Sequence, residues 1–532
     1  MYIVKALVQN YRCLRNTLVP LNQHLNILVG NNECGKSTLL EAIHLALTGQ
    51  LNGRYLQGEL HPHLFNTAAV EAYIAALKAN KASAPPAILI ELYFADHPDL
   101  ARLKGENNTL KEDAPGVRLQ IEFNPEFSAE YEQYVAKPDL IQTIPIEYYT
   151  FSWMSFADQA LTTSRSIALK PSLIDASALR NNSAASRFIL DIVKDSLSKK
   201  ERVDLALSYR HMKDDFLADE KVQAINESLL KRKGEISDKT LTVALDTTSR
   251  ASWETGIVPH LDDIPMPLVG KGEQNSVKIK LAMSSSEESH LFLIEEAESH
   301  LSFSNLNALI KHISEHRGDR QLIITTHSSF VLNKLGLDSV QFFSNGKTMT
   351  LNDLDDGTRD YFVKLPGHDT LRLILSRRAI LVEGPSDELI VQRAFMKKFS
   401  KMPLDMGVDV ITVNSLAFRR FLEIADLLDL EVDVLTDNDG DLDALVMKYE
   451  AFKDNKKLNI LYDKDTAYPT LEPQLLKANS LAVLNTILGK EYATEAELLA
   501  YMEKNKTECA LKFFETDEEW AVPGYIDHAV RE

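Results

Sequence analysis

The chain has 532 residues, of which 45% are hydrophobic and 25% are charged, and its formal net charge is −19. This length predicts two to four domains, and the composition is ordinary for a soluble protein. The sequence has no apolar run of about 18 residues and no signal-peptide pattern, and its three cysteines are widely spaced, so we expect a cytoplasmic protein with no membrane partner. The acidic charge weighs only weakly against nucleic acid as a partner, because a carboxylate-rich metal site is acidic by design.

A glycine-rich stretch from Gly30 to Thr38 fits the phosphate-loop pattern G-x-x-x-x-G-K-[ST]. An apolar strand at 25–29 precedes it and a helical pattern follows it, which is the context that the motif requires. Backbone N–H groups and the helix N-terminus would cradle the phosphates of ATP, Lys36 would reach them, and the Ser37 hydroxyl would bind Mg²⁺. The predicted nucleotide-binding residues here are Asn31, Gly35, Lys36, Ser37 and Thr38.

The rest of the first half predicts further strands and then a helical segment. We expect strands at 2–8, 87–94, 116–123 and 144–151. Between 184 and 235, apolar residues recur at helical spacing with many charges between them. This segment is either an inserted arm that mediates dimerisation or a set of extra helices packed on the head. The apolar faces are Phe188, Ile189, Ile192, Val193 and Leu197, and Val222, Ile225, Leu229 and Leu230.

Three further motifs follow in a fixed order. A glycine-rich turn at 270–274 precedes a helical pattern, an apolar strand ends in Glu295 and Glu296, and a second apolar strand ends at His327. A carboxylate at the end of a buried strand is costly unless it serves a metal or acts as a base.

This order of motifs resembles the ABC-type ATPase head. The resemblance implies that Glu295 holds the water shell of Mg²⁺, Glu296 polarises the attacking water and His327 senses the γ-phosphate. It also places the basic residue of the Asn10-Tyr11-Arg12 turn near the nucleotide, and it leaves Gln142 and Gln159 as alternatives for the glutamine loop. The turn at 270–274 would contact the phosphate held by a second subunit, with Gly270, Gly272 and Gln274 as the contacting residues.

The sequence from Leu293 to Leu301, Leu-Ile-Glu-Glu-Ala-Glu-Ser-His-Leu, resembles the OLD (overcoming lysogenization defect) branch of these ATPases. That branch usually has Pro where this chain has Ala297.

The C-terminal part contains a second set of acids at strand ends. An apolar strand at 379–382 runs into Glu383 and Asp387, and another at 434–436 runs into Asp437 and Asp439. Adjacent parallel strands would bring these acids into one crevice, where they cannot all be ionised without a divalent cation. The pair of motifs resembles a Toprim domain, which topoisomerases, primases and OLD nucleases share.

Two more stretches resemble the OLD form of Toprim. Thr470-Leu471-Glu472-Pro473 resembles the segment that supplies another metal-binding glutamate, and 505–511 resembles the helix whose lysine is Lys506 here. The resemblance implies two Mg²⁺ or Mn²⁺ ions held by the carboxylates, with Lys506 neutralising charge on the phosphate in the transition state. The implied catalytic residues of the nuclease are Glu383, Asp437, Asp439 and Lys506, and the implied metal ligands are Glu383, Asp387, Asp437, Asp439 and Glu472.

We therefore expect an α/β protein with an interrupted ABC-type ATPase head at 1–165 and 239–370, a helical, dimerising insertion at 166–238 and a Toprim domain at 371–532. The resemblance implies an ATP-regulated, metal-dependent DNA endonuclease, at least a homodimer, of the kind found in Gabija-type or retron-associated antiphage defence. A helicase-like protein or a retron RNA–DNA hybrid is a further possible partner. The alternative is an SMC-like clamp whose Toprim domain binds DNA without cutting it. A topoisomerase or a primase is disfavoured, because neither a tyrosine-bearing cleavage domain nor a zinc-binding primase module is visible.

Overall fold

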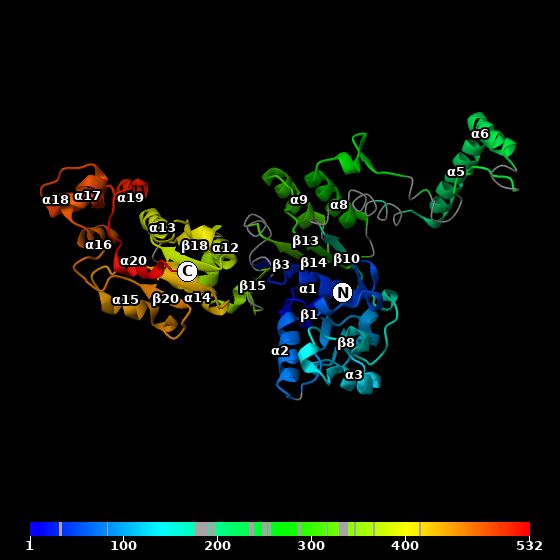
Figure 1. Cartoon of the computed structure of the whole chain (residues 1–532), viewed down its shortest axis with the longest axis horizontal. Coiled ribbons are helices and arrows are strands. Elements are labelled where there is room, and N and C mark those ends of the chain that lie inside the picture. The colour runs from blue at the N-terminus through cyan, green and yellow to red at the C-terminus, as the bar shows by residue number, and fades with distance from the viewer. Residues whose placement is uncertain are drawn as a thin grey trace. The chain divides into compact units, whose positions relative to one another are not determined.

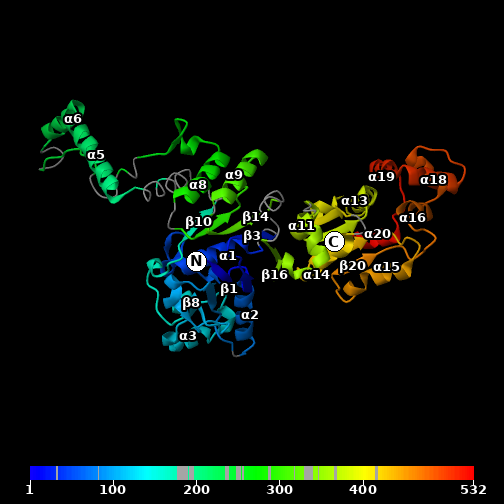
Figure 2. The same cartoon turned by 180° about the vertical axis from the view of Figure 1, so that it is seen from behind.

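The computed structural model describes residues 1–30, 34–81, 83–175, 190, 197–233, 239–246, 253, 257–285, 289–316, 318–328, 339–344, 347–364, 368–413 and 417–531. The chain forms two compact units, one of residues 1–168 with 323–532 and the other of residues 169–322. Figures 1 and 2 show the elements from opposite sides. No helix among the described residues has both the length and the apolar character needed to cross a membrane.

The first unit opens with an antiparallel sheet. Every residue of its strand β6 (Ile88–Phe94) is buried, and all of them except Glu91 are apolar or aromatic. Helix α1 (Lys36–Thr48) packs against β1, β6 and β8 through its apolar face. The strand order is β2 (Leu14–Pro20), β1 (Ile3–Tyr11), β6, β8 (Ala114–Phe123) and β7 (Lys104–Gly105), and β9 (Tyr149–Ser155) also pairs with β8. Smaller elements are the hairpin β4 (Gln50–Leu51) and β5 (Arg54–Tyr55), and helices α2 (Thr67–Lys78) and α3 (Ser128–Val135).

The strand expected at 144–151 is displaced towards the C-terminus. Residues 146–148 instead form a short 3₁₀ turn, in which the N–H of Tyr148 donates to the carbonyl of Pro145. Proline has no N–H to donate to a strand ladder, so the strand begins only after this turn, at Tyr149.

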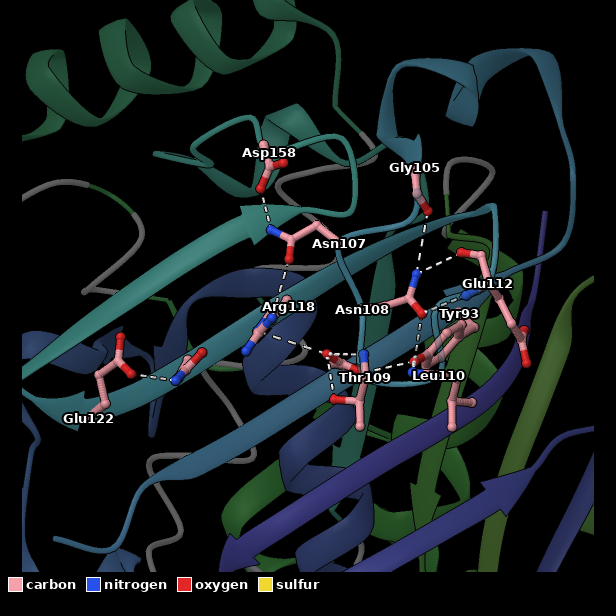
Figure 3. Close-up of polar contacts among 12 residues, drawn as sticks. Tyr93, Gly105, Asn107, Asn108, Thr109, Leu110, Glu112, Arg118, Glu122 and Asp158 are labelled. Atoms are coloured by element: carbon pink, nitrogen blue, oxygen red, sulfur yellow. Dashed lines mark hydrogen bonds and ion pairs between the residues drawn. The ribbon is translucent and has the colours of Figure 1, made fainter. Parts of the chain in front are cut away.

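A fully buried carboxylate fastens a loop to this sheet. Glu91 on β6 accepts hydrogen bonds from the N–H and the hydroxyl of Thr109, each at 3.0 Å, and from the hydroxyl of Tyr93 at 2.8 Å. Arg118 lies opposite on β8, with its Nε 3.8 Å from Oε1 of Glu91. Figure 3 shows Thr109, Tyr93 and Arg118 converging from the loop and from both strands. Loop 105–113 is therefore anchored by a paired charge.

A second set of strands in the same unit carries the phosphate loop. Strand β15 (Val340–Ser344) runs parallel to β3 (Leu25–Gly30) and antiparallel to β16 (Lys347–Thr350). Strand β14 (Gln321–Thr326), which belongs to this unit from residue 323 onward, neighbours β3. All six residues of β3 and of β14 are buried, including the polar Asn26 and Gln321.

The unit of residues 169–322 contains two parallel strands, β10 (Pro171–Asp175) and β13 (Leu291–Glu295). Helices α8 (Lys271–Ser285) and α9 (Phe303–His316) pack against each other, and α8 also contacts β10. A short hairpin, β11 (His260–Leu261) and β12 (Ile264–Pro265), precedes α8.

Two helices of this unit lie in the expected helical segment, α5 (Lys199–Ala218) and α6 (Glu220–Lys231), and they pack against each other (Figure 1). A capping box starts α5: the N–H of Ser198 donates to Glu201, and the N–H of Glu201 donates to the Ser198 hydroxyl. Of the predicted apolar faces, 188, 189, 192 and 193 lie outside the described residues. Val222 is buried, whereas Ile225 and Leu230 are exposed on α6, as are Val203, Leu207, Met212 and Phe216 on α5.

The C-terminal part of the chain is built on a four-stranded parallel sheet. Its order is β18 (Val408–Thr412), β17 (Arg378–Val382), β19 (Glu431–Leu435) and β20 (Leu458–Leu461). Strand β18 lies on one side of β17, and the next strand along the chain, β19, lies on its other side. The direction in which strands are added to the sheet therefore reverses between β17 and β19. The carboxyl ends of these two strands therefore border a crevice.

Helices cover both faces of this parallel sheet. Residues of β17 alternate between the faces, with Ile380 and Val382 packing in a core that also includes Phe395 and Ile526. At the start of β17, the buried Arg378 forms an ion pair with the buried Asp433 of β19. The helices are α11 (Asp356–Lys364), α12 (His368–Leu375), α13 (Pro385–Phe399), α14 (Phe418–Leu427), α15 (Leu442–Tyr449), α16 (Leu471–Ala478), α17 (Leu481–Leu488), α18 (Glu495–Lys504), α19 (Lys506–Glu515) and α20 (Gly524–Ala529).

Candidate functional site

Two predicted acids meet where β17 and β19 end. Oε1 of Glu383, just after β17, accepts hydrogen bonds from the hydroxyl of Thr436 at 2.7 Å and from the N–H of Asp437 at 3.1 Å. Both donors directly follow β19, so the carboxyl end of β19 fixes the acid that follows β17. The crevice expected from the strand order is thus lined by Glu383 and Asp437.

Asp387 enters the same crevice from the first turn of α13. Its Oδ2 accepts the N–H of Gly384 at 3.1 Å. Burial, followed by the charge of Glu383, raises the pKa of Asp387 to about 7. Burial, with Glu383, Asp387 and Glu472, raises the pKa of Asp437 to about 8. The charges of Glu383 and Glu472 thus act on both Asp387 and Asp437 and disfavour the ionised form of each.

Glu472 and Lys506 complete the cluster from α16 and α19. The Glu472 side chain is only 4% exposed, and its Oε2 lies 3.0 Å from Nζ of Lys506. The hydroxyl of Thr470 donates to the same oxygen at 3.2 Å. Burial alone would lower the pKa of Lys506, but the hydrogen bond and charge of Glu472, with the charges of Asp437 and Asp387, raise it overall. A protonated lysine therefore faces the carboxylates, as the sequence predicts.

Asp439 has a weaker connection to the cluster. It is exposed in the turn after β19, in the left-handed conformation with φ of 46°. The buried Asn438 organises this turn by donating to the carbonyls of Asp463 and Asp465 at 2.9 and 3.0 Å. Asp441 caps the start of α15. The metal-binding and catalytic roles of Asp439 stay predictions.

The donor set fits a hard divalent cation. As they stand, no three acidic, histidine or cysteine side chains of the described residues are grouped closely enough to hold a metal ion. Mg²⁺ and Mn²⁺ take oxygen ligands, and a cation here would remove the repulsion that raises the pKa of Asp387 and of Asp437.

The structure adds residues that the sequence did not predict. Thr436 holds Glu383, Thr470 holds Glu472, and Tyr525 on α20 lies near the acids. Burial, followed by the charges of Asp387 and Asp437, raises the pKa of Tyr525 well above its usual range, so its hydroxyl stays protonated. Thr436 directly precedes Asp437 in the sequence, whereas nothing in the spacing of Tyr525 marks it.

The phosphate loop has the geometry that its glycines require. A Cβ on Gly30 would lie 2.3 Å from the carbonyl oxygen of Phe343, and Gly35 has φ of 109°. Nζ of the buried Lys36 donates to the carbonyl of Gly30 at 2.7 Å, which places the ammonium group beside the end of β3. Ser37 is exposed at the start of α1, and Thr38 Oγ1 lies 3.3 Å from Sγ of Cys13. Asn31 lies outside the described residues.

Arg12 lies against the helix that follows this loop. Its Nε is 2.9 Å from Oε1 of Glu41 on α1, and its backbone is left-handed with φ of 48°. Both Gln142 and Gln159 are exposed, so both alternatives for the glutamine loop stay open. His327 directly follows β14 and is half-buried.

The unit of residues 169–322 carries the other nucleotide motifs. Glu295 ends β13 in register with Asp175 of β10, and Glu296 follows it with φ of 45°. Gly270 and Gly272 lie at the start of α8. The Gln274 side chain is buried there, where its Nε2 donates to the carbonyl of Val269 at 2.7 Å and closes its own turn. Contact of these three residues with the phosphate of a second subunit stays a prediction.

Comparisons with known proteins agree with this architecture. Residues 374–439 match the overcoming lysogenization defect protein-like TOPRIM domain, residues 5–133 match an AAA domain, and residues 156–333 match an AAA domain described for the AbiEii toxin of type IV toxin–antitoxin systems. The DNA replication and repair protein RecF of Lactobacillus delbrueckii subsp. bulgaricus is 23% identical over 375 residues, which cover 61% of this chain and 91% of that protein.

Solved structures with a similar head have low similarity scores. An Smc head bound to the C-terminal winged-helix domain of ScpA is 14% identical, with a TM-score of 0.35 over 66% of this chain and 99% of that one. The SMC head domain of Thermotoga maritima is 13% identical, with a TM-score of 0.31 over 65% of this chain and 97% of that one. The ATPase domains imply nucleotide binding, and the chain is an α/β enzyme. It joins an ABC-type ATPase head to an OLD-like TOPRIM domain, which is the architecture of the OLD family.

Proposed function

We propose that this chain is an ATP-regulated, divalent-metal-dependent DNA endonuclease whose Toprim domain hydrolyses phosphodiester bonds. The observation that carries the proposal is the crevice at the reversal point of the parallel sheet, where Glu383 accepts the N–H of Asp437 and Lys506 forms an ion pair with the buried Glu472. Burial and the charges of neighbouring acids raise the pKa of Asp437, and a cation would relieve both effects. The structural carboxylate Glu91 is by contrast surrounded by donors, whereas the strongest electrostatic neighbours of Asp437 are other acids.

The side chains divide the chemistry between them. Glu383, Asp387, Asp437, Asp439 and Glu472 would hold two Mg²⁺ or Mn²⁺ ions, which supply an activated water and stabilise the leaving oxygen. Thr436 and the N–H of Asp437 orient Glu383 towards the crevice. Once Glu472 is neutralised by a cation, the ammonium of Lys506 is available for the negative charge that develops on the phosphate.

The ATPase head would control the nuclease rather than drive it. Hydrolysis of a phosphodiester bond with two metals is downhill and needs no ATP, so the nucleotide serves another purpose. In the proposed cycle Lys36, Ser37 and Arg12 bind ATP, Glu295 holds its Mg²⁺, Glu296 activates water and His327 senses the γ-phosphate. If DNA binding changes the affinity of the head for ATP by some factor, then ATP binding changes the affinity of the protein for DNA by the same factor.

The functional form would be at least a homodimer. Apolar side chains on α5 and α6, among them Phe216, Ile225 and Leu230, are half exposed in the single chain and need a partner surface. The family's setting suggests antiphage defence in the cytoplasm, with DNA as substrate and with a helicase-like protein or a retron RNA–DNA hybrid as a further partner.

A plasmid-nicking assay with Mn²⁺ tests the proposal against the alternative of an SMC-like clamp. We expect wild-type protein to convert supercoiled plasmid to open circles, Glu383→Ala to lose this activity, and Asp443→Ala to keep it. Asp443 is a matched control because it is an exposed acid on α15. DNA binding without nicking by the wild-type dimer, with Mn²⁺ and with or without ATP, would favour the clamp.

A further inference from the structure

The loop after the acidic strand β13 has an unusual backbone. Glu296 and His300 both adopt the left-handed conformation, with φ of 45° and 64°. This conformation is unfavourable for residues other than glycine, and it persists where surrounding contacts enforce it, often at functional sites. The contacts of this loop therefore show what holds Glu296 in place.

Ser299 holds Glu296 by two hydrogen bonds. Its hydroxyl donates to Oε2 of the Glu296 carboxylate at 2.9 Å, and its N–H donates to the Glu296 carbonyl at 2.9 Å. The backbone bond closes the turn, and the side-chain bond fixes the rotation of the carboxylate. The hydroxyl bond to Oε2 therefore gives the carboxylate a defined orientation.

The start of helix α8 contacts the same loop at two points. Nδ2 of the fully buried Asn275 donates to the carbonyl of Ser299 at 3.3 Å. Gly272 approaches His300 so closely that a Cβ on it would lie 2.3 Å from the His300 carbonyl oxygen. The turn at 270–274 and the loop at 296–300 therefore cannot shift independently of each other.

We propose that Ser299 is a positioning residue for ATP hydrolysis, which orients the Glu296 carboxylate, and that the start of α8 sets this orientation through Asn275 and Gly272. The inference rests on the proposed ATPase function, in which Glu296 takes a proton from the water that attacks the γ-phosphorus as the bond to the β–γ bridging oxygen breaks. It adds a route within one subunit by which contact at 270–274 reaches the group that activates water.

Steady-state ATP hydrolysis by the full-length protein tests this role. We expect Ser299→Ala to lower kcat about tenfold while KM for ATP stays within about twofold, because orientation of the base matters only in the chemical step. Ser299→Thr keeps the hydroxyl and should recover most of the rate. Ser304→Ala removes an exposed serine on α9, outside this loop, and should hydrolyse ATP as the wild type does.

Two further variants separate the possible failures. Gly272→Ala should reproduce the loss of kcat with nucleotide affinity retained, because its Cβ displaces the His300 carbonyl. A wild-type kcat for Ser299→Ala, or equal losses for the Ala and Thr variants, would overturn the positioning role. An unchanged kcat for Glu296→Gln would instead refute the proposed base itself, and binding of a fluorescent ATP analogue by each variant would show that its head is folded.

Discussion

Glu91 in the antiparallel sheet and Asp437 in the Toprim crevice are both carboxylates removed from bulk water, and the chain treats them in opposite ways. Glu91 is fully buried, and donors surround it: the N–H and hydroxyl of Thr109, the hydroxyl of Tyr93 and the guanidinium of Arg118 (Figure 3). Asp437 is half-buried, and its strongest electrostatic neighbours are other acids. The first arrangement stabilises a fold, and the second leaves charge to be neutralised from outside.

The contrast supplies a criterion for finding sites in such a chain. Burial of an acid does not by itself indicate function, because Glu91 is more buried than Asp437 and fastens a loop. What distinguishes the crevice is that Asp387, Asp437 and Glu472 repel one another while Lys506 neutralises only part of their charge. The following changes test this distinction.

The largest effect should follow removal of an acid from the crevice. We expect Asp437→Ala to lower the rate of DNA cleavage by about 10²-fold or more, because the metal site loses a ligand. Above about pH 8, where Asp437 is ionised, the temperature of unfolding of the metal-free protein should not fall, because the mutation also removes repulsion with Glu383 and Asp387. Plasmid nicking and differential scanning calorimetry measure the two quantities. Cleavage at the wild-type rate would place the nuclease site elsewhere.

Removal of Glu91 should have the opposite profile. We expect Glu91→Ala to destabilise the head by about 3 kcal/mol, because Thr109 and Tyr93 lose a buried acceptor and Arg118 loses the opposite charge beside it. Urea unfolding would report this loss. Cleavage per folded molecule should stay near the wild-type value, and a selective loss of activity without destabilisation would contradict the structural role of Glu91.

The affinity of the crevice for metal should depend on pH. The pKa of Asp387 is about 7 and that of Asp437 about 8, against an ordinary value of 3.8, so the folded metal-free protein holds protons that the unfolded chain releases. The two protonated groups therefore contribute to the free energy of unfolding of the metal-free protein at acidic pH, and this contribution is lost as the pH rises to about 7 to 8. A metal ion must displace the same protons in order to bind. The affinity of the crevice for metal should therefore rise with pH, by about tenfold per pH unit for each proton displaced.

Calorimetric titration with Mn²⁺ in buffers of different ionisation enthalpy measures this proton release directly. Proton release near neutral pH that disappears in Asp437→Asn would support the assignment. An affinity that is flat between about pH 6 and pH 8 would mean that these two groups do not bind the metal.

Much of the fold could be predicted because its signals are local. The strands that carry the phosphate loop and the acids are unbroken apolar runs, and β3, β6 and β13 begin and end close to the expected positions. The phosphate loop and the acids of the Toprim crevice have spacings that a single sequence displays. The expected strand at 144–151 was wrong at its start, because the turn after Pro145 delays it to Tyr149.

The remaining features depend on contacts between distant parts of the sequence. Thr436 could be noticed beside Asp437, but its bond to Glu383 spans 53 positions. Tyr525 reaches the acids only because α20 packs on β19 and β20. Likewise the spacing of Gln274 indicates a turn that faces a nucleotide, whereas the structure closes its side chain onto Val269. Spacing along one chain carries no information on these pairings.

The smallest effect should come from a carboxylate in the same loop that Glu91 fastens. Glu112 forms an ion pair with Lys5 at 2.5 Å, but its side chain is 45% exposed and its partner is 22% exposed. Water solvates both charges when the pair is broken, so Glu112→Gln should cost about 0.5 kcal/mol or less, and less still at high salt. Urea unfolding of Glu112→Gln beside Glu91→Gln compares an exposed acid of loop 105–113 with the buried acid of β6 that fastens the same loop. If the two variants were equally destabilised, the loss of stability would come from the contact of loop 105–113 with the sheet rather than from burial of the charge. The contrast between Glu91 and Asp437 would then lose its physical basis.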